Sequence, residues 1–326
     1  MSKKVRVACI ALLLIVSMGY VFAAGQKDTT YPAKEIHMVI PWAAGGGTDS
    51  IGRALAAAME EQGITVVVDN IQGAAGITGS IKVATAKPDG YTILMNGDTD
   101  FLSALVFTDV AVPLTLDDFV YVGGFYETPT WILSHADSGI TSMEQFLAKA
   151  KANPGKVALG SGTPAGGQMV MAAAIKGQTG LDMLVIPYQS GNDMKKALLG
   201  NQVDAGIIHS PVLLPEVEAG LINVIGTGDS LKNITYAPVR NTKTLKEIGV
   251  DLSMGITRGV YVPKDTPKEI VDALTAIVEK AAYSDLFKKF GDSFGFAPTW
   301  IPGPTFEKNH REGLGLFVEV KEKYIN

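Results

Sequence analysis

The stretch Ile36–Ser50, IHMVIPWAAGGGTDS, decides the fold class of this 326-residue chain. It begins with a short apolar run that is typical of a strand, and the glycines Gly45–Gly47 then allow a tight turn. The three residues after the glycines are types that cap helix N-termini, and an amphipathic helix is predicted over Asp49–Gln62. The next apolar run, Ile64–Asp69, predicts another strand. The stretch therefore begins a strand–helix–strand unit.

The same alternation continues along the chain. A helix over Gly79–Ala86 and a strand over Tyr91–Met95 follow, and a second series of alternating elements runs from residue 142 to residue 227. Repeated units of this kind predict an α/β fold with mostly parallel sheets flanked by helices. About 300 residues exceed one ordinary core, so we expect two lobes. We predict lobe I over residues 25–126 plus 251–326 and lobe II over residues 127–250.

The first residues predict an export signal. Three basic residues precede a mostly apolar run from Val7 to Val21, and small residues at 23–25 offer a cleavage site, so residues 1–24 are interpreted as a signal peptide. The run is short for a membrane span, although an uncleaved anchor is the alternative. The only cysteine, Cys9, lies inside this segment and is badly placed for a lipoprotein site. Cleavage would leave a chain without thiols, disulfides or cysteine-ligated metal.

The charge of the chain argues against nucleic acid as a partner. The formal net charge is −5, and removal of residues 1–23 with their three positive charges makes it −8. A protein of this charge gains no electrostatic help in binding nucleic acid or anionic lipid. Any anionic ligand must therefore be held by local groups.

Four strand-to-helix turns are the candidates for those local groups. They lie at residues 41–50, 70–80, 161–167 and 187–192, and each contains glycine with small or polar residues. Ligands of open α/β sheets bind outside the carboxyl ends of the strands, where helix N-termini present free N–H groups that favour anions. Opposed across a cleft, these turns could hold one or two carboxylates.

Motifs for other chemistry are missing from the sequence. The second turn has the spacing G-x-x-G-x-x-G rather than the dinucleotide fingerprint, and the first lacks the ending of a P-loop. The four histidines are scattered without metal-ligand spacing, and Ser161 does not lie in a nucleophile elbow. We therefore expect no catalytic residue, metal or cofactor. His209 ends a predicted strand and is retained as a ligand contact.

An ordered series of motifs resembles the tripartite tricarboxylate transporter solute-binding receptors, also called the Bug family. The series covers the chain after the signal segment. Its pieces are IHMVIPWAAGGGTD at 36–49 with Arg53, GAAG at 73–76, KPDGYT at 87–92, GSGT at 160–163, VIPY at 185–188, LGNQVD at 199–204, TLKE at 244–247 and VPKDTP at 262–267. The resemblance implies a type II periplasmic binding protein, a two-lobed Venus flytrap.

The resemblance also implies which residues grip a ligand carboxylate. Carried over by position, they are Gly45, Gly46, Thr48, Asp49, Gly76, Ile77, Ser161, Thr163 and Tyr188. The chain departs from the family pattern at two further candidates. Trp42 stands where Phe or Tyr is commoner, and Arg258 replaces the aromatic residue that usually precedes the glycine at 259. We expect Arg258 to lie near the hinge and to contact a distal carboxylate, the alternative being a solvent-exposed arginine.

Taken together, the sequence predicts an extracytoplasmic receptor that closes around a small carboxylate and delivers it to the large and small subunits of a membrane permease. We expect it to act as a monomer. A sensory protein that presents its ligand to a membrane histidine kinase would have the same sequence features and is the alternative. An exported hydrolase is the third interpretation, and it lacks an assembled nucleophile and base.

Overall fold

The computed structural model describes residues 31–108, 113–162, 166–209, 213–229 and 234–325. The chain divides into two units, Met1–Ala33 and Lys34–Asn326, and both sheets belong to the second. The predicted signal peptide and Cys9 lie outside the described residues. No helix in the described part of the chain has the length and apolar character that crossing a membrane requires.

The first sheet is mixed. Among the described residues its order is β11-β4-β10-β3-β1-β2, with parallel pairs where β1 contacts β2 and β3 and antiparallel pairs around β4 and β10. The strands are β1 (Ile36–Ile40), β2 (Val66–Asn70), β3 (Thr92–Gly97), β4 (Phe119–Pro129), β10 (Gly255–Pro263) and β11 (Ile301–Pro302). The parallel part is the predicted strand–helix–strand unit.

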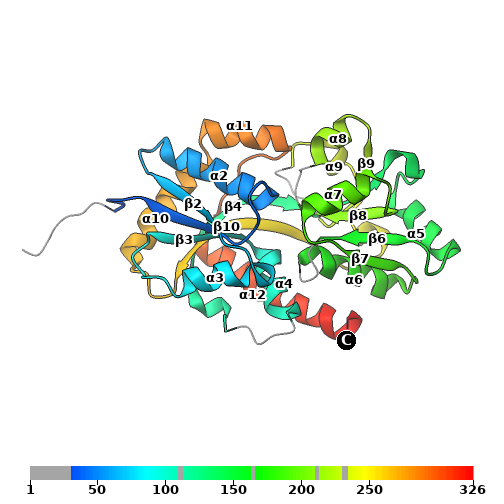
Figure 1. Cartoon of the computed structure of the whole chain (residues 1–326), viewed down its shortest axis with the longest axis horizontal. Helices are drawn as coiled ribbons and strands as arrows, with labels where there is room; N and C mark the ends of the chain where they lie inside the picture. The colour runs from blue at the N-terminus through cyan, green and yellow to red at the C-terminus, as the bar shows by residue number, and fades with distance from the viewer. Residues whose placement is uncertain (1–30, 109–112, 163–165, 210–212, 230–233, 326) are drawn as a thin grey trace, which may run out of the picture. The chain divides into compact units, whose positions relative to one another are not determined.

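Helices pack against this sheet and against one another. In Figure 1, α2 and α11 lie on one side of the strands and α3, α4 and α12 on the other. The α2 helix packs against α10 and α11, whereas α12 packs against α4. The apolar stripe of α2 explains this, since Ile51, Leu55 and Met59 recur at helical spacing and are all fully buried. The bounds are α2 (Gly47–Glu60), α3 (Ile77–Ala84), α4 (Asp98–Phe107), α10 (Lys268–Ala282), α11 (Asp285–Phe294) and α12 (Gly303–Tyr324).

The second sheet has the order β7-β6-β8-β5-β9. The pairs β6–β7 and β6–β8 are parallel, and β5 is antiparallel to β8 and β9. Its strands are β5 (Trp131–His135), β6 (Ala158–Ser161), β7 (Leu184–Pro187), β8 (Ala205–Ile208) and β9 (Ile222–Thr227). The helices of this part are α5 (Met143–Ala152), α6 (Gly167–Thr179), α7 (Gly191–Leu199), α8 (Leu214–Glu218) and α9 (Ala237–Arg240).

The predicted α/β class, with two sheets flanked by helices, is confirmed. The prediction of mostly parallel sheets is corrected, because both sheets are mixed. The antiparallel strands β4, β5 and β10 are those that carry the chain toward or away from the second sheet. The helix α4 was not predicted at all.

Three chain segments meet between the two sheets at Thr130, Gly228 and Met254. Their backbones form a closed ring of hydrogen bonds: Gly228 N–H donates to Thr130 O at 2.7 Å, Met254 N–H to Gly228 O at 3.1 Å, and Thr130 N–H to Met254 O at 3.3 Å. The segments of β4–β5 and β9–β10 are thus joined where they pass from one sheet to the other. In addition, α12 packs against α6, which flanks the second sheet.

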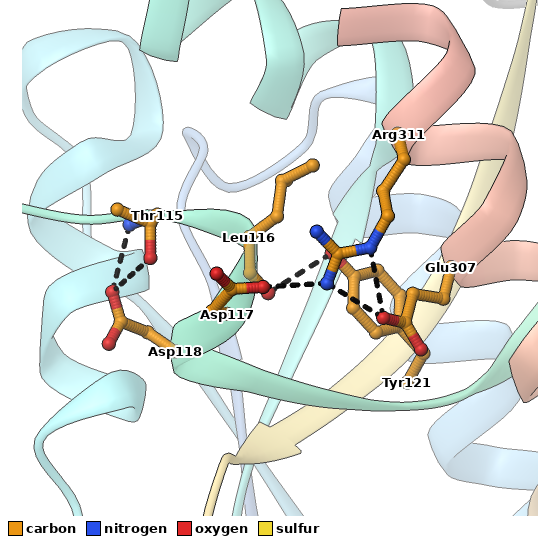
Figure 2. A network of polar contacts seen from close by, with 7 residues as sticks. All are labelled: Thr115, Leu116, Asp117, Asp118, Tyr121, Glu307 and Arg311. Carbon is orange, nitrogen blue, oxygen red and sulfur yellow. Dashed lines mark hydrogen bonds and ion pairs between the residues drawn. The ribbon is translucent and has the colours of Figure 1, made fainter.

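A surface network fixes α12 to the turn before β4 (Figure 2). The Arg311 side chain donates to Asp117 at 2.6 Å and to Glu307 at 2.8 Å, and both carboxylates are exposed. In the same turn, Thr115 and Asp118 form a capping box. Exposed ion pairs of this kind contribute little to stability. Arg311 is therefore an arginine on the surface with both of its carboxylate partners in place.

Candidate functional site

A cavity of about 360 Å³ opens where strand ends of both sheets approach each other. Side chains and backbone of β1–α2, α4 and β10 line it from the first sheet, and those of α6, the β7–α7 turn and β8 line it from the second. The lining residues are Trp42, Ala43, Gly46, Gly47, Thr48, Gln72, Asp100, Gln168, Gln189, Ser190, Gly191, Asn192, Asp193, Ile208, His209 and Arg258. The cavity therefore lies at the carboxyl ends of the parallel strands, as expected for an open α/β sheet.

The β1–α2 turn is held from beneath by Asp49. This carboxylate is 2% exposed and accepts hydrogen bonds from Gly45 N–H at 2.8 Å, Arg53 Nε at 2.9 Å and Asn70 Nδ2 at 2.9 Å. Burial alone would raise the pKa of Asp49, but these hydrogen bonds outweigh burial and lower it below its ordinary value. Asp49 does not line the cavity; it fixes the turn whose Gly46–Thr48 segment does.

Substituting Asp49 by alanine is expected to destabilise the protein by about 2 kcal/mol, since three donors then lose a charged acceptor. Chemical denaturation measures this change. The control is Asp272→Ala, which breaks an exposed ion pair with Lys268 and should change stability by less than about 0.5 kcal/mol. Equal effects of the two substitutions would contradict the anchoring role of Asp49.

Trp42 forms one wall of the cavity. Its Nε1 donates to Asn96 Oδ1 at 2.8 Å, which fixes the indole plane. Gly76 lies against the indole: it has φ +93°, and a Cβ there would come within 3.2 Å of Trp42 Cζ2. Gly76 thus packs against the Trp42 indole, and it is not among the residues that line the cavity.

Arg258 lies within β10 and is 2% exposed. Its Nε donates to Thr48 Oγ1 at 3.3 Å, and its guanidinium carbon lies 5.1 Å from the centre of the Tyr126 ring. The Nη1 atom is buried and has no hydrogen-bond partner among the described residues. A buried guanidinium nitrogen without an acceptor is unfavourable, so this wall of the cavity is suited to an anion. The alternative prediction of a solvent-exposed arginine is wrong.

Asp100 and His209 lie opposite each other in the cavity wall. The Asp100 carboxylate is 8% exposed, accepts the N–H of Gly167, and lies 3.9 Å from His209 Nε2. Burial raises the pKa of Asp100 to about 6, against the attraction of Arg258. Burial also lowers the pKa of His209 to about 3, and the Arg258 charge acts in the same direction. At neutral pH His209 is therefore uncharged, with Nδ1 2.7 Å from Thr130 Oγ1.

The second sheet contributes the N-terminus of α7. Ser190 caps this helix, accepting the N–H of Asp193 at 3.2 Å and donating to its carboxylate at 2.7 Å. Residues Gln189–Asp193 line the cavity, so a helix N-terminus from each lobe, α7 and α2, reaches it. Backbone N–H groups at such termini attract anions.

Five of the predicted ligand residues are brought together in this cavity: Trp42, Gly46, Thr48, His209 and Arg258. The predicted residues Gly45, Asp49, Gly76, Ile77, Ser161 and Tyr188 do not line it. Ile77 and Ser161 are buried in the core, Gly45 is exposed, and Tyr188 is half-buried beside β6. Thr163 lies outside the described residues.

Sequence reasoning missed Asp100, Gln168, Gln72 and the residues Gln189–Asp193 as lining residues. The sequence indicates the turn at 187–192 as part of the site, but the resemblance points to Tyr188, whereas residues 189–192 line the cavity. Asp100 was missed because α4 was missed. The described residues include no group of three or more His, Cys, Asp or Glu side chains placed to hold a metal ion.

Comparisons with known proteins bear on the family and the fold. The family described as "Tripartite tricarboxylate transporter family receptor" matches residues 51–304. A relative from Pseudomonas sp. (strain P51), "UPF0065 protein in tcbD-tcbE intergenic region", is 30% identical over 260 residues, 78% of this chain and 76% of the relative. A TctC solute binding protein from Polaromonas is 27% identical in its crystal structure, with a TM-score of 0.72 over 90% of this chain and 100% of that one. MatC from Rhodopseudomonas palustris, solved with bound malate, is 19% identical with a TM-score of 0.76 over 89% of this chain and 99% of that one, a likeness of fold alone.

Proposed function

Because this chain belongs to the tripartite tricarboxylate transporter receptor family, as its motifs predicted, we propose that it captures a small carboxylate in the cavity between its sheets and delivers it to the membrane permease of that transporter. The family is one of binding proteins, not of enzymes. We further propose that residues 1–24 direct export, that the mature protein works in the periplasm, and that it acts as a monomer.

The observation that carries this proposal is the Nη1 atom of Arg258, which is buried beside a cavity that both sheets line and has no partner in the described parts of the chain. A ligand carboxylate would supply the missing acceptor, with the helix N-termini at Thr48 and Ser190 providing further N–H groups. The bound malate of MatC supports the class of ligand, since malate is a small carboxylate.

The positions of the lining residues support closure of the lobes around the ligand. Trp42, Thr48 and Arg258 come from the first sheet and its helices, whereas Gln168, Ser190 and His209 come from the second. Both groups can contact one small ligand only when the sheets are held together. We propose that the segments at Thr130, Gly228 and Met254 are the hinge, with lobes I and II bounded as the sequence predicts.

The experiment is a thermal-unfolding screen of the purified protein against carboxylic acids. A ligand at a hundredfold its Kd stabilises the native state by about 2.7 kcal/mol, so the unfolding midpoint should rise with ligand concentration. Binders are then titrated calorimetrically, and small-angle scattering should show a smaller radius of gyration with ligand bound. If no acid raises the midpoint, the proposal is refuted.

A further inference from the structure

The charges that line the cavity do not suit a ligand with several negative charges. The described lining residues carry two carboxylates, Asp100 and Asp193, and one guanidinium, Arg258. His209 adds no charge at neutral pH, because burial lowers its pKa to about 3. A dicarboxylate that pairs with Arg258 would therefore bring a second negative charge into a wall that already holds Asp100.

The two acids differ in their surroundings. Asp193 is at the rim, 45% exposed, with Ser190 and Lys196 as partners. Asp100 is buried, and its described partners are the Gly167 N–H and the charge of Arg258. A buried carboxylate needs a proton or a positively charged partner, and once a ligand carboxylate pairs with Arg258 that partner must come from the ligand.

A second observation also indicates a donor on the ligand. Gln168 lies in α6, which packs against the helix α4 that carries Asp100. Gln168 lines the cavity, and its Oε1 atom is buried without a partner among the described residues. An amide oxygen can only accept a hydrogen bond. The cavity thus presents an unpartnered donor at Arg258 and acceptors at Asp100 and Gln168.

We propose that the site selects a zwitterion: a ligand whose single carboxylate pairs with Arg258 and whose ammonium group pairs with Asp100, as in an α-amino acid with a neutral side chain. This inference rests on the proposed function and narrows its ligand class. An ammonium group supplies both a positive charge for Asp100, whose partner Arg258 is taken by the ligand carboxylate, and a donor for Gln168 Oε1. The bound ligand then adds no net charge to the cavity.

Matched ligand pairs test the proposal by calorimetry at pH 7.5. Each neutral α-amino acid is compared with the same acid lacking its amino group, for example alanine with propanoate and leucine with 4-methylpentanoate, and succinate and malate are included. An amino acid should bind at least about 30-fold more tightly than its deaminated partner, a difference of about 2 kcal/mol. If succinate or a deaminated acid binds as tightly, the zwitterion proposal is wrong and the carboxylate function stands. If none of the acids binds, both fail.

Asp100→Asn is the decisive variant, because asparagine keeps the shape of the side chain and removes its charge. The preference for the amino acid over its partner should fall at least tenfold. The matched control is Asp98→Asn on the same helix: Asp98 does not line this cavity, and its Oδ1 accepts the N–H groups of Thr99 and Thr257. The control should keep the wild-type preference, and an unchanged preference in Asp100→Asn would overturn the proposal.

The pH dependence of wild-type binding gives a readout that does not depend on a folded variant. Charged or titratable groups near Asp100 are Arg258 on β10, His209 after β8 and Asp98 on its own helix. Since burial raises the pKa of Asp100 to about 6, protonation between pH 7.5 and 5.5 removes the partner of the ammonium group. Amino acid affinity should fall about fourfold over this range. A rise in amino acid affinity over this range would refute the proposal.

Discussion

Replacing Arg258 by methionine is expected to weaken ligand binding about 100-fold without loss of stability. The Nη1 atom of Arg258 is buried and has no partner among the residues that the structure describes, while Nε donates to Thr48, so the guanidinium is a largely desolvated cation. A bound carboxylate would accept charge-assisted hydrogen bonds from it, and removal of one partner of a buried charged pair costs about 2–5 kcal/mol. Calorimetric titration with the tightest acid found in the screen measures the loss.

Stability and affinity should respond differently in this variant. Methionine has a similar length and no charge to desolvate, which stabilises the free protein, but its introduction also removes the charge that attracts Asp100, so the midpoint of thermal unfolding without ligand should stay close to that of the wild type. A merely structural arginine would give the reverse, a lower midpoint with unchanged affinity. Arg258→Lys should recover only part of the affinity, because an ammonium group lacks the two parallel N–H donors of the guanidinium.

Arg311→Met is the matched control. Arg311 is half-exposed on α12 and has both its carboxylate partners, Asp117 and Glu307, in place (Figure 2). Its loss should leave ligand affinity unchanged and alter stability by about 1 kcal/mol or less. An equal loss of affinity in the two variants would show that Arg258 acts through a general change in charge or folding rather than through contact with the ligand.

The strand–helix–strand units could be predicted because their pattern is local. In α2 the buried residues recur at helical spacing, and the glycine turn before it indicates both the end of β1 and the start of the helix. The pairing of β4 with β10 could not be predicted in the same way. These two strands are over a hundred residues apart in the chain, and the sequence of neither strand indicates which distant strand it pairs with.

The helix α4 was missed because its polar residues Thr99, Asp100 and Ser103 are buried together with its apolar ones. Residues 98–107, DTDFLSALVF, pack against the sheet, α6 and α12, so they show no apolar stripe with a helical period. That omission hid Asp100. Within the turns that were identified, which residue faces the cavity depends on the packing behind it, and so Ser161 and Ile77 became core residues while Gln168 and Ser190 came to line the wall.

Gly228→Ala is expected to be among the most destabilising substitutions in the chain, at about 3 kcal/mol or more. A Cβ at Gly228 would lie 2.0 Å from the carbonyl oxygen of Met254 and 2.6 Å from Met171 Cε. The methionine side chain can rotate, but Met254 O cannot withdraw without breaking its hydrogen bond from Thr130 N–H. Overpacking against backbone costs about 1–3 kcal/mol and occasionally more, and here the whole ring of backbone bonds between the sheets must distort.

Gly315→Ala separates this clash from the general effect of replacing glycine. Gly315 is exposed within α12, and a Cβ there would meet nothing within 4 Å. Alanine at that position should stabilise the protein by up to about 1 kcal/mol, because it favours the helix. Thermal unfolding of the two variants should therefore give midpoints on opposite sides of the wild-type value. A Gly228→Ala protein as stable as the wild type would mean that the segments at Thr130, Gly228 and Met254 are free to separate, and they could not then act as a defined hinge.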